Sequence, residues 1–200
     1  MLGVYNQRTM EAKARMILNK YCPECLNKPT EVPLEKLAEA LGIDIEYQYL
    51  TKKGEKVLGK LICTDGLTPY YDMELGEYRL LNVSANTIII EARLADNEEN
   101  RGRYRFTLAH EIAHWLIHRE NIVSNSVEAA FDEEKHNTQM EKQADFFASA
   151  LLMPSVPVKR YFFSLRNKLH SESEIINDMS QHFGVSKQAM QICLKRHNLI

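Results

Sequence analysis

The sequence predicts an α+β fold, in which a small, mainly antiparallel sheet packs on a helical core and a helical C-terminal region follows. Two observations predict this class. Alternating or β-branched patterns typical of strands occupy residues 43–90, whereas helical periodicity dominates from about Arg101 onward. Because the strands gather in one block and most helices in another, the chain indicates an α+β arrangement rather than repeated βαβ units.

Two helices are expected ahead of the sheet. Residues Thr9–Tyr21 carry apolar side chains at helical spacing, and a loop with several prolines follows them. A second helix is expected from Leu34 to Leu41, because Gly42 stands at the position just past a helix end that glycine favours.

Turn signals such as Asp65-Gly66 divide the next block into candidate strands. Alternation or β-branched side chains single out four runs, which are Ile43–Tyr47, Val57–Cys63, Tyr78–Val83 and Asn86–Ile90. The last of these runs is the richest in β-branched residues. We therefore expect one sheet of three to five strands.

Helical patterns fill the remainder of the chain. One helix carries residues 109–116, a polar connection is expected over residues 121–137, and a further helix, Gln139–Met153, ends at Pro154. We expect residues 1–155 to form one domain and residues 156–200 a helical extension. In that extension the turn around Gly184 has the spacing of a helix-turn-helix, although a packed helical hairpin is the preferred interpretation.

Composition and charge exclude several classes of protein. The chain has 200 residues, of which 44% are hydrophobic and 26% charged, and its net charge is −2. This composition is typical of a globular protein and provides no attraction to nucleic acid or acidic lipid. No apolar run approaches the roughly 20 residues that cross a bilayer, and the first residues do not resemble a signal peptide. We therefore expect a cytoplasmic protein with no membrane partner. Cys22 and Cys25 have the spacing of a metal or redox motif, but no second such pair follows, so an ordinary reduced pair is the preferred interpretation.

The strongest chemical signal is the H-E-x-x-H motif of residues 110–114, which lies within a helical pattern. Histidines four residues apart share one face of a helix, so His110 and His114 can bind one metal ion. Glu111 lies beside them, where it can take a proton from a water bound to that metal. The motif therefore indicates a zinc-dependent hydrolase with Glu111 as general base.

A catalytic zinc ion needs a third protein ligand. Ile117 and Glu120 occupy the positions that metzincins use for their glycine and third histidine, which excludes that class. The gluzincin arrangement takes a glutamate from a later helix, and Glu141 provides it. Asp145, one turn beyond, would accept a hydrogen bond from a ligand imidazole. A site with Asp145 as ligand in place of Glu141 is the less favoured alternative.

Other polar residues are candidates for supporting roles. His118 lies one turn beyond His114, but a fourth protein ligand would close the site to substrate. We therefore expect His118 to support the ligands rather than to bind the metal. Tyr161, His136 and His170 are candidates for the group that stabilises the oxyanion.

Two segments resemble a known family. Residues 105–114 read R-F-T-L-A-H-E-I-A-H, and residues 141–154 read E-K-Q-A-D-F-F-A-S-A-L-L-M-P. Together they resemble the ImmA/IrrE family of metallo-endopeptidases, and the similarity extends from about Pro33 to Pro154 and more loosely beyond. The Cys22/Cys25 pair and Cys193 depart from the pattern of that family.

The resemblance implies that His110, His114 and Glu141 bind one zinc ion, although another divalent metal could take its place. It also implies that Glu111 is catalytic. Members of the family are bacterial or phage regulators that typically cleave a helix-turn-helix repressor. The implied partner is therefore a protein substrate, such as a repressor encoded nearby. The alternative function is a DNA-binding or partner-binding regulator that uses residues 174–198 and has a structural or vestigial metal site.

Overall fold

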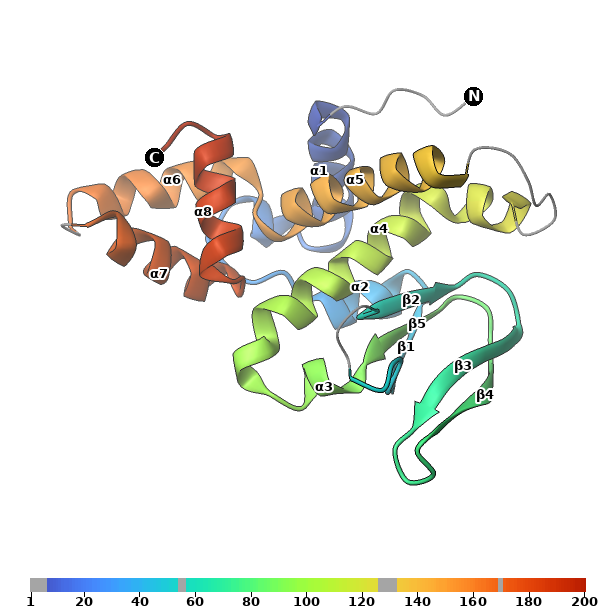
Figure 1. The fold of residues 1–200 in the computed structure, drawn as a ribbon. Helices are drawn as coiled ribbons and strands as arrows, with labels where there is room; N and C mark the ends of the chain where they lie inside the picture. Colours follow the sequence, from blue (N-terminus) through green and yellow to red (C-terminus); the bar gives the residue numbers. More distant parts are fainter. Residues whose placement is uncertain (1–6, 54–56, 126–132, 169–170) are drawn as a thin grey trace. The chain divides into compact units, whose positions relative to one another are not determined.

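The structure is a computed structural model (Figure 1). It describes residues 7–53, 57–125, 133–168 and 171–200. The connection expected over residues 121–137 is shorter than predicted, because α4 continues to Asn125 and α5 begins at Glu133. His170, one of the candidates for oxyanion stabilisation, lies outside the described residues.

The chain divides into two compact units. One unit comprises Leu34–Ala144 and holds the described strands, whereas the other comprises Met1–Pro33 and Asp145–Ile200 and is helical in its described part. The expected division into residues 1–155 and 156–200 differs from these units and stays a prediction. None of the described helices is long and apolar enough to cross a membrane.

A three-stranded sheet forms the centre of the unit Leu34–Ala144. Its strands lie in the order β1 (Asp44–Gln48), β5 (Thr87–Glu91) and β2 (Gly59–Ile62). β5 pairs in parallel with β1 and antiparallel with β2. All five residues of β5 are buried, as expected of a β-branched run with a strand on each side. The observed strands and helices confirm the predicted α+β class.

The strands β3 (Gly66–Asp72) and β4 (Glu77–Val83) form a separate antiparallel hairpin. The sequence predicted one sheet, so the second sheet is a correction, although two of the three strand pairings are antiparallel as expected. Strand β3 was not predicted because Pro69 interrupts its pattern, and a proline argues against a central strand. The backbone N–H of Tyr71 donates to the Tyr49 carbonyl, outside the hairpin. The nitrogen of Pro69, two residues earlier, faces the same edge of β3, so Pro69 can lie opposite Leu80 without removing a hydrogen bond to β4.

The helix α4 (Arg101–Asn125) packs on β2 and β5 of the three-stranded sheet (Figure 1). Its buried side chains include Leu108, Ala109 and Ile112, which have no exposed surface. Burial of each large aliphatic side chain contributes about 1.5–3 kcal/mol. Because these residues hold one face of α4 against the sheet, the H-E-x-x-H motif is fixed beside strand β2.

The second unit is a helical assembly. Its described elements, besides the C-terminal part of α5 (Glu133–Leu152), are α1 (Gln7–Tyr21), η1 (Pro23–Leu26), α6 (Ser155–Arg166), α7 (Glu172–Phe183) and α8 (Lys187–Arg196). Between α7 and α8 the chain turns at Gly184, which has φ +62°. The Ser186 side chain accepts a hydrogen bond of 3.1 Å from the backbone N–H of Ala189 and so begins α8 with a side-chain cap.

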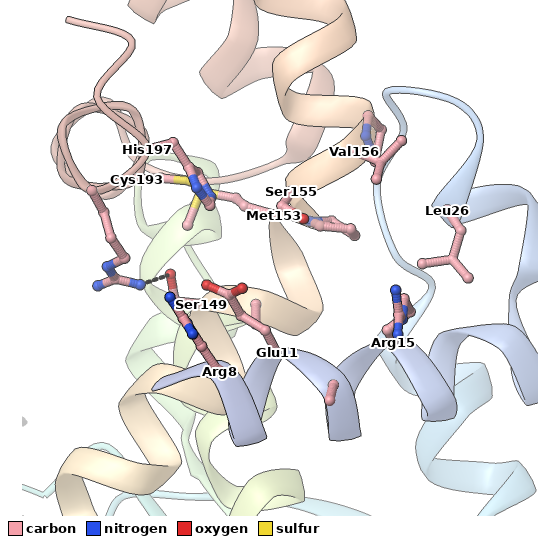
Figure 2. A pocket seen from close by; sticks show the side chains of 15 residues that line it. Arg8, Glu11, Arg15, Leu26, Ser149, Met153, Ser155, Val156, Cys193 and His197 are labelled. Atoms are coloured by element: carbon pink, nitrogen blue, oxygen red, sulfur yellow. Dashed lines mark hydrogen bonds between the residues drawn. The ribbon is translucent and has the colours of Figure 1, made fainter. Parts of the chain in front are cut away.

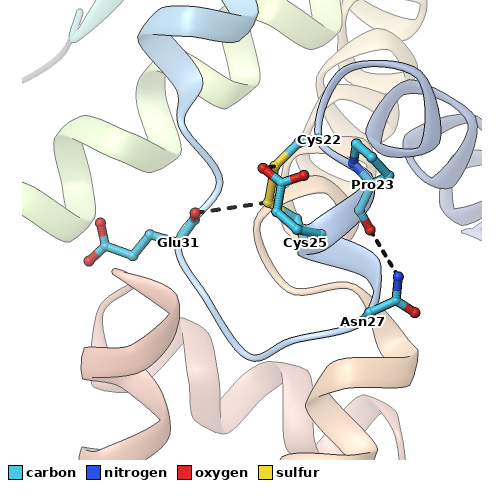
Figure 3. Close-up of a disulfide and its surroundings, with 6 residues drawn as sticks. Cys22, Pro23, Cys25, Asn27 and Glu31 are labelled. Carbon is cyan, nitrogen blue, oxygen red and sulfur yellow. Dashed lines mark hydrogen bonds between the residues drawn. A yellow bond between two sulfur atoms is a disulfide. The ribbon is translucent and has the colours of Figure 1, made fainter.

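Cys22 and Cys25 are joined by a disulfide in this unit (Figure 3). The sequence predicted a reduced pair, so the disulfide is a correction. The 3₁₀ turn η1 follows Cys22 directly, and residues three apart in such a turn lie one above the other. The Cα atoms of the two cysteines are 5.6 Å apart, within the range that a disulfide spans. An Asn27 side-chain N–H donates a 3.1 Å hydrogen bond to the Pro23 carbonyl and closes the turn.

Candidate metal centre

Three predicted donor side chains come together in the unit Leu34–Ala144. His110 and His114 project from α4, and Glu141 projects from α5. The two histidine Nε2 atoms are 3.0 Å apart. The Glu141 carboxylate lies 3.1 Å from Nε2 of His110 through Oε2, and 3.3 Å from Nε2 of His114 through Oε1. The structure thus brings together two neighbours on one helix and a third residue from another helix.

The chemistry and spacing of these donors fit a zinc ion. Two imidazoles and one carboxylate form a known ligand set of catalytic zinc, whose bonds measure about 2.0–2.2 Å. Tetrahedral ligands at that bond length lie about 3.3 Å apart, close to the observed separations. Two imidazole lone pairs and a carboxylate repel one another at such distances unless a proton or a cation lies between them. The Glu141 side chain is 50% exposed, so the cluster is open to solvent on that side.

Glu111 is buried next to the cluster and is only 9% exposed. Burial raises the pKa of its carboxyl group to about 7, and the negative charge of Glu141 contributes in the same direction. His110 and a hydrogen bond from the backbone N–H of Leu61 lower that pKa in part. A carboxyl group with a pKa near neutrality can both accept and return a proton.

Strand β2 lies directly against the Glu111 side chain. A Cβ atom added to Gly59 would lie 2.8 Å from Oε1 of Glu111 and 2.8 Å from Cγ2 of Thr107. Real Cβ atoms do not approach other atoms so closely, so only glycine allows β2 to approach α4 at this point. Sequence reasoning did not single out Gly59, although an isolated glycine within a strand pattern is a signal of close backbone approach.

A chain of hydrogen bonds extends from His114 away from the donor cluster. The Nδ1 atom of His114 lies 3.1 Å from Nδ1 of His118, and Nε2 of His118 lies 2.9 Å from Oε1 of Gln143. His118 has no exposed surface, and Gln143 is 3% exposed. The expected supporting role of His118 therefore has a physical basis in its contact with His114, and that role stays a proposal.

With the Gln143 amide in the orientation that the structure gives it, this chain of contacts favours one tautomer of His114. Because Oε1 of Gln143 is an acceptor, Nε2 of His118 carries its hydrogen and Nδ1 of His118 accepts one. His114 then donates from Nδ1, which leaves its Nε2 lone pair available for a metal ion. In this orientation the side-chain amide Nε2 of Gln143 is buried without a hydrogen-bond partner among the described residues. A buried donor without a partner lowers the stability of the fold.

Gln143 was missed by sequence reasoning. It lies four residues before Phe147 and eight before Leu151, both fully or almost fully buried, and so falls within the apolar stripe of α5. A polar residue in such a stripe is itself a signal, because a buried polar group requires a hydrogen-bond partner.

We expect Gln143→Leu to weaken zinc binding by about 10- to 100-fold, as the loss of residues that hold metal ligands usually does. Without the Gln143 acceptor, His118 can carry its hydrogen on Nδ1 and donate it to Nδ1 of His114, which places the hydrogen of His114 on its ligand nitrogen Nε2. The zinc dissociation constant, measured by competition with a fluorescent chelator, tests this expectation. Gln139→Leu, an exposed position on the same helix, is the control. Equal zinc affinities of the two variants would show that Gln143 does not support the site.

The remaining predicted residues have different surroundings. Asp145 follows Glu141 by one turn of α5 and is exposed, and its predicted hydrogen bond to a ligand imidazole stays a prediction. The Tyr161 hydroxyl on α6 donates a 2.7 Å hydrogen bond to the Asp178 carboxylate, which raises the pKa of Tyr161 together with burial. His136 lies in the first turns of α5, and its side chain is outside the described part of the chain.

A known protein family matches the part of the chain that contains the donor cluster. The IrrE N-terminal-like domain, Peptidase_M78, matches residues 71–195. The chain belongs to this family. The matched residues of this IrrE-like chain include α4 and α5 and therefore all three candidate ligands and Glu111. The resemblance to ImmA/IrrE peptidases that the sequence predicted is thus confirmed, whereas strand β2 with Gly59 precedes the matched residues.

A solved structure of a Mycobacterium tuberculosis transcriptional regulator resembles the IrrE-like chain in fold. The two share 16% sequence identity and a TM-score of 0.53, over 92% of this chain and 55% of the regulator. The IrrE-like chain therefore spans about 55% of the length of that regulator. At this identity the similarity concerns the fold alone. No curated protein matches the sequence.

Proposed function

We propose that this chain is a zinc-dependent endopeptidase that cleaves a specific regulatory protein, such as a helix-turn-helix repressor. The observation that carries this proposal is the position of Glu111, a buried carboxyl group on the same helix as two of the three clustered donor residues. Membership of a peptidase family supports it. The nature of the substrate rests on the sequence resemblance.

The residues of the chain have separate tasks in this mechanism. His110, His114 and Glu141 would hold the ion, which when bound lowers the pKa of water and polarises a carbonyl group. Glu111 accepts a proton from the attacking water and delivers it to the nitrogen of the leaving amine. His118 and Gln143 keep the ligand nitrogen of His114 unprotonated.

Strand β2 offers a place for the substrate backbone. Among the described strands it has β5 as its one neighbour, so its other edge can pair with an extended peptide. The same strand contacts Glu111 through Gly59 and Leu61. A peptide added along β2 would therefore lie next to the general base.

The direct test combines metal analysis with a cleavage assay. The purified chain is expected to contain about one zinc ion, and incubation with a helix-turn-helix protein encoded beside it should give defined fragments by mass spectrometry. A chelator should stop the cleavage, and added zinc should restore it. Intact candidate substrates in the presence of the zinc-loaded chain would contradict the proposal for those substrates, and absence of any bound metal would contradict it altogether.

We expect Gly59→Ala to reduce the cleavage rate at least about tenfold without changing the zinc content. The added methyl group displaces the Glu111 carboxylate, and a small misplacement of a catalytic group is costly in rate. It meets none of the ligands His110, His114 and Glu141 among its three nearest contacts. Gly66→Ala is the matched control, because a Cβ atom at Gly66 has open space around it. Equal rates for both variants would rule out the positioning role of Gly59.

The DNA-binding alternative gains little from the structure. The helix α8 carries three basic residues, Lys187, Lys195 and Arg196, of which Arg196 donates to Ser149 and lies over the Phe146 ring. Lys187 and Lys195 are exposed, and two lysines provide a small electrostatic footprint for DNA. Binding through residues 174–198 stays a prediction that a salt-dependent titration with duplex DNA can test.

A further inference from the structure

A cavity of about 220 Å³ lies within the helical unit that comprises Met1–Pro33 and Asp145–Ile200. Residues from α1, the end of α5, the beginning of α6 and the end of α8 line it (Figure 2). It is separate from the donor cluster, whose residues belong to the unit Leu34–Ala144.

Three arginines face this cavity. Arg8 and Arg15 project from α1 (Figure 2), and among the described residues neither has a hydrogen-bond or ion-pair partner. Arg196 on α8 uses one N–H group to donate a 3.1 Å hydrogen bond to Oγ of Ser149. A guanidinium group has five N–H donors, so most of the donor capacity of this cluster is available to a ligand.

The other polar lining residues add little negative charge. Glu11 is the one carboxylate among the described lining residues, and it accepts a 3.0 Å hydrogen bond from the Gln7 side chain. Burial raises the pKa of the Cys193 thiol to about 11, so this residue is neutral near pH 7. Burial also lowers the pKa of His197, and the positive charges of Lys159 and Arg196 add to that shift. The cavity is therefore positively charged within a chain whose net charge is −2.

We propose that this cavity binds a small organic anion with a hydroxyl group next to its phosphoryl or carboxylate group. The guanidinium groups of Arg8 and Arg15, which have no partner among the described residues, suit the oxygens of such a group, because arginine donates in a planar fork that matches them. The Glu11 carboxylate and the Ser149 hydroxyl can accept the hydrogen bond of a ligand hydroxyl. The apolar side chains of Leu26 and Met153 contact its carbon skeleton.

The volume of the cavity restricts the size of the ligand. Pockets for drug-sized molecules measure about 300–1,000 Å³, so about 220 Å³ suits a metabolite of only a few carbon atoms. The start of α6 also lines the cavity through Pro154, Ser155 and Val156, and no side chain caps this helix. The positive end of the α6 dipole therefore lies at the wall of the cavity and has the same sign of charge as the arginines.

Calorimetric titration of the full chain with two probes tests the proposal. Glycerol 3-phosphate carries a phosphoryl group and malate carries carboxylates, and both carry a hydroxyl group. At a constant ionic strength of about 0.15 M, we expect saturable binding of at least one probe with a dissociation constant below about 1 mM. Binding of the first identifies a phosphoryl ligand and binding of the second a carboxylate, whereas neutral glycerol should not bind.

Charge variants show whether the cavity is the binding site. Arg15→Gln is expected to weaken binding about tenfold. Glu11→Gln should strengthen it, because the glutamine amide oxygen still accepts the hydrogen bond of the ligand hydroxyl and the negative charge that repels the anion is removed. Arg166→Gln removes the same charge from the exposed far end of α6 and should have no effect. Absence of saturable binding by both probes, or equal affinities in Arg15→Gln and Arg166→Gln, would overturn the proposal. Binding requires no cleavage of peptides, so this proposal and the peptidase function succeed or fail separately.

Discussion

Replacement of Glu111 by glutamine is expected to lower the cleavage rate by about 10²–10⁴-fold, the usual contribution of a general base. The glutamine amide has nearly the shape of the carboxylate, so the packing against Gly59 is preserved. The amide cannot take a proton from water, however. Because Glu111 is not one of the clustered donors, the variant should retain its zinc ion.

Zinc content by elemental analysis and the rate of fragment formation are measured on the same preparation. Glu120→Gln is the control, because Glu120 is an exposed glutamate farther along α4. It should leave both quantities unchanged. A Glu111→Gln variant that cleaves at the rate of the unmodified chain would remove Glu111 from the mechanism. A variant that loses its zinc would show instead that Glu111 maintains the metal site.

Replacement of His114 by alanine is expected to have the largest effect on metal binding. The variant loses one of the three donors and leaves two, His110 and Glu141, of which Glu141 is half exposed. The purified protein should then contain almost no zinc and show no cleavage. The fully buried His118 also loses its contact with His114, and an unsatisfied buried polar group costs about 1–3 kcal/mol of stability.

Elemental analysis and thermal unfolding in the presence of a chelator separate these two effects. The chelator removes the contribution of the metal to stability, so any remaining decrease in the unfolding temperature comes from the broken contact with His118. His182→Ala, a substitution of a half-exposed histidine on α7, should change neither zinc content nor cleavage. A His114→Ala variant with a full complement of zinc would exclude His114 as a ligand.

Most elements of the fold were predictable because their signals are local. The alternation of residues 43–47 and the β-branched run ending at Ile90 correspond to β1 and β5 within one residue at each end. Helix ends also followed local rules, such as the side-chain cap at Ser186. Strand β3 was not predicted because it contains Pro69. A proline fits a strand only where its nitrogen faces away from the partner strand, and the pairing of strands is not a local property.

In the candidate site, too, the residues with local signals were predictable and those without were not. The spacing of His110, Glu111 and His114 depends only on the geometry of one helix, so a sequence pattern was enough to place them together. Glu141 could be named because its motif resembles that of a family, although 31 residues separate it from His110. No pattern of that kind marked Gln143.

The sequence by itself determined the fold class, the shared helix face of the two histidines and the family to which the chain belongs. Only the tertiary structure placed Gly59 against Glu111, extended the hydrogen bonds of His114 to Gln143 and brought arginines of α1 and α8 to the lining of one cavity. The reason is that periodicity encodes which residues share a face. Which faces then meet depends on the packing of side chains far apart in the sequence.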